Sequence, residues 1–186
     1  MKSSLFLNNI TVIDHGYIGN DGRQHGGSFH ASFEVSGSVD GTEQVVIDFS
    51  AVKKTIKELV DHRDTGFDHK LWVIPGWSDC EVETIVGNTT IRSSALEISG
   101  PGNMLRIVQS KEYSPEAIAA EIAKYVQAGL AQAYPGVNPE VKCKLSEVGF
   151  INAPGNHRAY FRYSHGLRNS SSWGCQNISH GHLSWL

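Results

Sequence analysis

An alternating run over residues 28–38 constrains the fold more than any other feature of the chain. Every second residue from position 29 is apolar and the residues between them are polar. The apolar residues are Phe29, Ala31, Phe33 and Val35, and the polar ones are His30, Ser32, Glu34 and Ser36. Successive side chains of a strand point to opposite faces, so this pattern predicts a strand with one buried and one solvated face. Another layer must cover the buried face.

Two helices can supply that layer. Val52, Ile56 and Leu59 recur at helical spacing after Ser50, which predicts an amphipathic helix from Ser50 to near His62. The triplet Ser114-Pro115-Glu116 is typical of a helix start, with a capping serine, a proline in the first turn and an acid at the positive helix end. The sequence Tyr134-Pro135-Gly136 ends this second helix.

Short apolar runs predict the remaining strands. They lie at residues 5–13, 45–49, 71–74, 80–86, 104–108, 141–148, 160–165 and 180–186. Strands and helices do not alternate regularly, so a doubly wound parallel sheet is not expected. The order predicts an α+β fold, an antiparallel sheet with two helices packed on one face.

Composition excludes several functional classes. The chain has 186 residues, a formal net charge of −3 and a pI near 6.3, which gives no basic footprint for nucleic acid. No apolar run reaches the roughly 20 residues of a membrane span, and no secretory signal is apparent. The three cysteines are widely spaced, which argues against a disulfide framework and for a reducing compartment. We therefore expect a cytoplasmic protein without membrane or nucleic-acid partners.

The sharpest chemical signal is the pair His180 and His182, which flank Gly181. On a strand these two side chains share a face and can bind one metal ion. His165 lies on the preceding predicted strand, and three histidines with an open fourth position are typical of catalytic zinc. Cys175, in the connecting loop, is either a fourth ligand or a nearby thiolate. Such a histidine pair also occurs as plain polar surface.

The C-terminal segment resembles the zinc hairpin of the 6-pyruvoyl- and 6-carboxytetrahydropterin synthases. Residues 160–167 match a first strand that reads like F-S-A-x-H-x-L, Cys175 matches the catalytic cysteine, and residues 180–182 match the H-G-H pair. A second region agrees, because the segment around Asp48-Phe49 is followed by Asp68-His69, which resembles the family's Asp-His motif. Glu147 matches the glutamate that holds the pterin ring.

The order of these segments is unusual, because the family's zinc hairpin normally comes first. At that place stand His15 and His25-Gly26-Gly27, where H-G-H is expected, and Gly27 cannot bind metal. We interpret residues 1–150 as a first copy of the tunnelling fold with a degenerate metal hairpin. Residues 151–186 are then the zinc-binding hairpin of a partial second copy, which cannot fold by itself.

The resemblance implies a zinc-dependent lyase acting on 7,8-dihydroneopterin triphosphate, in tetrahydropterin or queuosine-type biosynthesis. Its sites lie where subunits meet, so a homo-oligomer is expected. Cys175 would be a general base, and Asp68 would orient His69 for proton transfer. Without the resemblance, Asp68-His69 also fits a helix-loop cap, and Glu147 a solvated strand residue.

Three alternatives remain open at this point. The first is a catalytically inactive zinc-binding subunit of the same fold. The second is another enzyme of this fold that processes a pterin or GTP. The third is a metal-free interaction domain, in which the histidines at positions 15, 25, 30, 62 and 157 and those of the C-terminal segment are all incidental.

Overall fold

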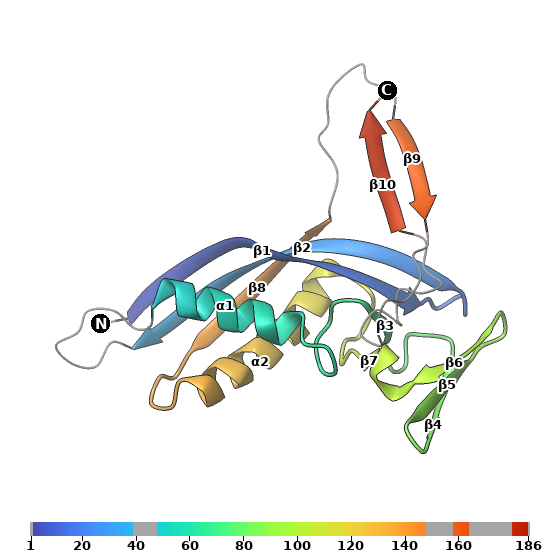
Figure 1. Cartoon of the computed structure of the whole chain (residues 1–186), viewed down its shortest axis with the longest axis horizontal. Coiled ribbons are helices and arrows are strands. Elements are labelled where there is room, and N and C mark those ends of the chain that lie inside the picture. The colour runs from blue at the N-terminus through green and yellow to red at the C-terminus, as the bar shows by residue number, and fades with distance from the viewer. Residues whose placement is uncertain (1, 39–47, 148–157, 164–179, 186) are drawn as a thin grey trace.

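A five-stranded sheet forms the centre of the protein (Figure 1). The computed structural model describes residues 2–38, 48–147, 158–163 and 180–185, with the backbone alone for residues 2, 3 and the last two segments. The sheet has the order β7-β3-β1-β2-β8. Its strands are β1 (Lys2–Ile18), β2 (Gln24–Ser38), β3 (Lys70–Val73), β7 (Leu105–Ile107) and β8 (Glu140–Glu147).

The α+β class is confirmed, and the sheet is mixed instead of antiparallel throughout. β1 pairs with β2, and β2 with β8, in antiparallel register, whereas β3 lies parallel to both β1 and β7. The reason is the path of the chain. β2 ends beside the start of β1, α1 (Phe49–Val60) returns along the sheet, and β3 enters beside His15 in the direction of β1.

Both predicted helices are confirmed, together with their start signals. The Asp48 carboxylate accepts the Ser50 N–H at the start of α1, and the Ser114 hydroxyl accepts the Ala117 N–H at the start of α2 (Pro115–Ala133). Phe49 belongs to α1, which corrects its assignment to a strand, because the cap at Asp48 already begins the helix. The rest of that predicted strand, residues 45–47, lies outside the described residues.

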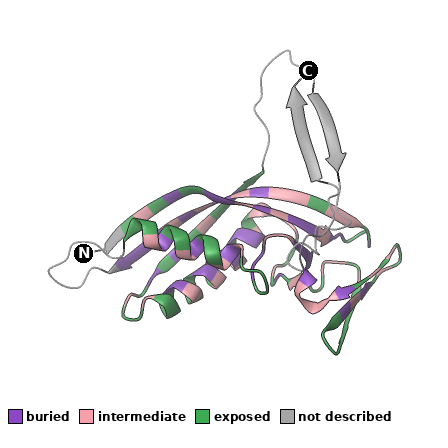
Figure 2. Cartoon of the chain, in the orientation of Figure 1, coloured by how far each residue is buried: buried purple, intermediate pink, exposed green. Residues whose placement is uncertain are grey.

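The helices cover one face of the sheet, as Figure 1 shows, and the main core lies between these layers. Both helices turn their buried residues toward the strands, and their outer faces are exposed (Figure 2). The two helices approach closely where Leu59 of α1 fills the space above Gly129 of α2. The core side chains from the sheet and the two helices are Ile13, Phe29, Phe33, Val52, Ile56, Ile118, Ile122 and Val126.

A separate three-stranded antiparallel sheet follows β3. It consists of β4 (Glu81–Ile85), β5 (Asn88–Arg92) and β6 (Glu97–Pro101), and a 3-10 helix, η1 (Gly102–Met104), returns the chain to β7. β4 is close to its predicted range, whereas β5 and β6 were not predicted. A small core containing Leu71, Ile91 and Met104 joins this sheet to the central one.

The C-terminal strands form a hairpin, as predicted. β9 (Arg158–Tyr163) pairs with β10 (His180–Trp185) in antiparallel register. Neither helix of the described part of the chain combines the length and apolarity that crossing a bilayer requires.

The turn between α1 and β3 is tight at Gly66. The Gly66 N–H donates to the His62 carbonyl over 2.8 Å, and the Phe67 N–H donates to the Val60 carbonyl over 2.8 Å. A Cβ on Gly66 would lie 2.6 Å from both the nitrogen and the carbonyl oxygen of His62, and it would also overlap the Val60 carbonyl. These neighbours are backbone atoms, which cannot rotate away.

We therefore expect Gly66→Ala to lower the free energy of unfolding by on the order of 2 kcal/mol, because the turn must open to admit a methyl group. Urea denaturation measures this change. Gly102→Ala is the matched control, since its Cβ would meet the Gly87 carbonyl at a milder 3.3 Å. Equal stability of the Gly66 variant and the wild type would contradict this account of the turn.

Candidate functional site

Asp68 and His69 lie at the junction of β1 and β3. The Asp68 carboxylate accepts the Asp14 N–H over 2.9 Å, and the His69 N–H donates to the Asp14 carbonyl over 2.7 Å. Asp68 therefore binds a strand and does not cap a helix. Asp14 itself accepts a short hydrogen bond from the Ser28 hydroxyl on β2. Three segments of the chain thus meet at one acidic cluster.

The Asp68 carboxyl is held in an environment that disfavours its charge. Its pKa is raised from 3.8 to about 6, chiefly by burial; His69 and the Asp14 N–H oppose this rise, and the neighbouring charges of Asp61 and Asp14 add to it. The side chain is 15% exposed and the His69 ring 36% exposed. Asp68 can therefore gain or lose a proton near neutral pH, which suits a proton-transfer role.

The backbone at His69 brings its ring to Asp68. In an extended chain, adjacent side chains point to opposite faces. His69 instead has a φ of 56°, in the left-handed region, and its Nε2 lies 3.4 Å from an Asp68 oxygen. A non-glycine residue in that region costs energy and persists only where its surroundings impose it. The imidazole and the carboxyl therefore form a pair whose geometry the backbone sets.

Two basic residues brace the loop that carries this pair. The buried Lys70 ammonium donates short hydrogen bonds to the carbonyls of Arg63 and Asn103. Arg106 donates to the Thr65 carbonyl over 2.8 Å, and its guanidinium lies 4.2 Å from the Phe67 ring centroid. Such contacts hold a site in one geometry before substrate arrives.

Glu147 lies exposed at the end of β8, opposite Phe29 on β2. Burial raises the pKa of two phenols, Tyr17 and Tyr113, and the charge of Glu147 adds a smaller contribution to each shift. An exposed carboxylate beside aromatic rings can accept paired N–H groups from a flat heterocycle.

An aromatic cluster fills the same end of the sheet around His15. The His15 ring is fully buried and stacks on Trp72, with ring centroids 3.6 Å apart. Its Nε2 lies 2.8 Å from the Tyr113 hydroxyl, and Tyr113 stacks on Tyr17 at 3.7 Å. His25 lies 3.0 Å from an Asp21 oxygen. Among the residues with described side chains, no three potential ligands lie where one metal ion could bind them.

The C-terminal ligand candidates are described in part. His180 pairs with Tyr163 and His182 with Phe161, so the two histidines lie two residues apart on β10 and share a face. A zinc ion shared by this pair stays a prediction. His165 and Cys175 lie outside the described residues, so their arrangement relative to this pair stays a prediction.

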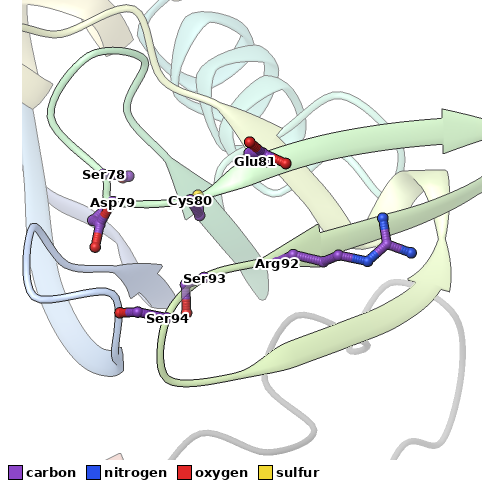
Figure 3. A pocket seen from close by; sticks show the side chains of 7 residues that line it. All are labelled: Ser78, Asp79, Cys80, Glu81, Arg92, Ser93 and Ser94. Atoms are coloured by element: carbon purple, nitrogen blue, oxygen red, sulfur yellow. The ribbon is translucent and has the colours of Figure 1, made fainter.

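A polar cavity of about 370 Å³ lies elsewhere, between the β3–β4 connection and β5 (Figure 3). It is lined by Ser78, Asp79, Cys80, Glu81, Arg92, Ser93 and Ser94. Burial, together with Asp79, raises the pKa of the Cys80 thiol, which keeps it protonated. None of the predicted site residues lines this cavity, and we assign it no role in the reaction.

The sequence did not single out Asp14, Ser28 or Tyr113. Asp14 and Ser28 meet only through strand register, and Tyr113 is 98 residues from His15. The one available signal was Gly27 in place of a histidine, which indicated a changed site without naming the replacement.

Comparisons with known proteins agree with this fold. The sequence profile of the 6-pyruvoyl tetrahydropterin synthase family matches residues 7–156. A catalytic-residue mutant of Plasmodium vivax 6-pyruvoyltetrahydropterin synthase is 17% identical, with a TM-score of 0.56 over 80% of this chain and 99% of that one. The Plasmodium falciparum enzyme is 19% identical, with a TM-score of 0.53 over 78% and 91%. No curated protein sequence matches the chain significantly.

The raised pKa of Asp68 predicts an unusual dependence of stability on pH. The folded state holds the proton more tightly than the unfolded state does, so this group contributes less stability as pH rises from 3.8 to about 6. Asp68→Asn keeps an oxygen for the Asp14 N–H and removes the charge. We expect it to unfold at higher temperature than wild type at pH 8, with a gain of about 1 to 3 kcal/mol that fades toward pH 4.

Asp64→Asn provides the control with the opposite sign. A hydrogen bond from Asn103 lowers the pKa of the exposed Asp64 carboxyl, so its charge favours the folded state. That variant is expected to be less stable than wild type at pH 8 and to match it at low pH. If Asp68→Asn were instead less stable than the wild type between pH 4 and 8, the burial of the Asp68 charge would not have the energetic cost inferred here.

Proposed function

The chain belongs to the 6-pyruvoyl tetrahydropterin synthase family, and on that basis we propose that it is a zinc-dependent pterin synthase. The proposed reaction converts 7,8-dihydroneopterin triphosphate to 6-carboxy- or 6-pyruvoyl-tetrahydropterin with loss of triphosphate. The single observation that carries this proposal is the Asp68–His69 pair, a buried carboxyl with a pKa of about 6 beside an imidazole. The reaction moves protons on the substrate side chain, and this pair can accept and return one near neutral pH.

The proposed roles divide between the two sections of the chain. His165, His180 and His182 would hold zinc, which as a Lewis acid makes the adjacent substrate C–H more acidic. Cys175 would remove a proton as the general base. Asp68 orients His69 for the second proton transfer, and Glu147 accepts N–H groups of the pterin ring.

The β1–β2 hairpin does not fit zinc, because position 27 is glycine and the His15 Nε2 is hydrogen-bonded to Tyr113. A metal would therefore come from the second hairpin, either of this chain or of another copy in a homo-oligomer. A first copy without a metal site of its own also favours the alternative of a zinc-binding subunit without turnover. In that alternative the second hairpin binds zinc and the first copy serves as a scaffold.

Metal content tests the zinc assignment first. We expect about one zinc per chain in the purified protein by mass spectrometry, and loss of that zinc in His180→Ala. His30→Ala is the matched control, because His30 lies on β2 among the histidines to which no ligand role is given. Equal zinc content in the wild type and His180→Ala would show that His180 is not a zinc ligand.

Turnover tests the role of the acid–base pair. Asp68→Ala is expected to retain zinc and to release triphosphate from 7,8-dihydroneopterin triphosphate about 100-fold or more slowly, since general acid–base catalysis contributes factors of that size. Unchanged turnover in a zinc-loaded Asp68→Ala protein would count against the proposal. Zinc without turnover in the wild type would identify the scaffold alternative.

A further inference from the structure

The β1–β2 hairpin has histidines at two of the three positions expected for metal ligands and a glycine at the third. His15 pairs with Gly27 across the two strands, and Tyr17 pairs with His25, so positions 15, 25 and 27 share one face of the hairpin. This is the geometry that the H-G-H pattern would use to gather three imidazoles around one ion. Two of the three are present, and the third position has no side chain.

The Tyr113 hydroxyl fills the space that a side chain at position 27 would need. A Cβ on Gly27 would lie 2.6 Å from this hydroxyl and 3.0 Å from the His15 Nε2. Carbon and oxygen do not approach that closely in folded proteins. Any residue other than glycine at position 27 would therefore have to displace Tyr113.

The same hydroxyl also occupies the nitrogen of His15 that would face a metal. The His15 Nδ1 lies 3.3 Å from the Ile13 carbonyl, which can only accept, so Nδ1 carries the proton. Nε2 is then the acceptor, and the Tyr113 hydroxyl, 2.8 Å away, donates to it. The lone pair that a metal would use is satisfied by a hydrogen bond.

We infer that Tyr113 has taken the place of the third ligand and its metal, so that the β1–β2 hairpin is closed by a hydroxyl–imidazole hydrogen bond within an aromatic cluster. Gly27 and Tyr113 form one unit in this arrangement: the glycine makes room and the tyrosine fills it. The hairpin therefore differs from a three-histidine site at two residues, the glycine at position 27 and the tyrosine at position 113. This inference does not depend on the proposed reaction.

A metal-rescue experiment tests the inference on the full chain. His180→Ala and His182→Ala are introduced first, so that the second hairpin contributes no site. Gly27→His and Tyr113→Ala are then added singly and together, and Co²⁺ is titrated while its visible absorption is recorded. We expect about one Co²⁺ per chain in the combined variant and none in the background or in either single variant. His25→Ala in the combined variant should abolish binding.

Two outcomes would overturn the inference. Binding by Gly27→His alone would show that Tyr113 is no obstacle. A combined variant that melts cooperatively and still binds no Co²⁺ would show that the hairpin no longer holds ligand geometry.

A metal-free comparison keeps the test decisive if the combined variant fails to fold. Gly27→Ala is made in the wild type and in Tyr113→Phe, which lacks the hydroxyl that lies 2.6 Å from the added Cβ. We expect a clear fall in melting temperature in the wild type and a much smaller fall in the Tyr113→Phe background. Equal falls in the two backgrounds would contradict the pairing of Gly27 with Tyr113.

Discussion

The junction at Asp14 determines where the third strand joins the sheet. Its N–H donates to the Asp68 carboxylate and its carbonyl accepts the His69 N–H, so both backbone groups of one β1 residue bind the loop that leads into β3. The register that follows pairs His15 with Lys70 and Tyr17 with Trp72. Trp72 then stacks on His15, and Lys70 reaches back to the loop. The position of the acid–base pair and the packing of the aromatic cluster thus share one origin.

The aromatic cluster and Asp68, which both adjoin this junction, bury their polar groups in different ways. At the aromatic cluster, the pairing of His15 with Tyr113 is neutral: a hydroxyl donates to an imidazole, and flat rings stack around them. A hydrogen bond of this kind stabilises by about 1 kcal/mol, and each aromatic pair adds about as much. At Asp68 the carboxylate is charged at neutral pH, and its burial opposes folding. The first arrangement stabilises the protein, whereas the second weakens it.

Local patterns in the sequence were sufficient for both helices and most of the strands, and insufficient for the way in which these elements pair. The caps at Asp48 and Ser114 and the alternation along β2 predicted both helices and the half-buried strand, because each depends on nearby residues. The parallel entry of β3 depends on the path of α1, which alternation does not encode. The polar strands β5 and β6 have no apolar period to reveal them. Asp68, His69 and Glu147 came from a family resemblance, and Tyr113 meets His15 only in the folded chain.

The fold alone does not require a charged residue at position 68. The Asp14 N–H requires an acceptor, and an asparagine oxygen would serve as well without the penalty of a buried charge. His69 likewise adopts a left-handed backbone that a glycine would accept with less strain. The buried charge of Asp68 and the left-handed backbone of His69 thus both oppose stability at this junction. The same geometry places the His69 Nε2 3.4 Å from an Asp68 oxygen. Strain and a shifted pKa at one point are typical of proton-transfer sites, and the proposed acid–base role rests on their meeting at this junction.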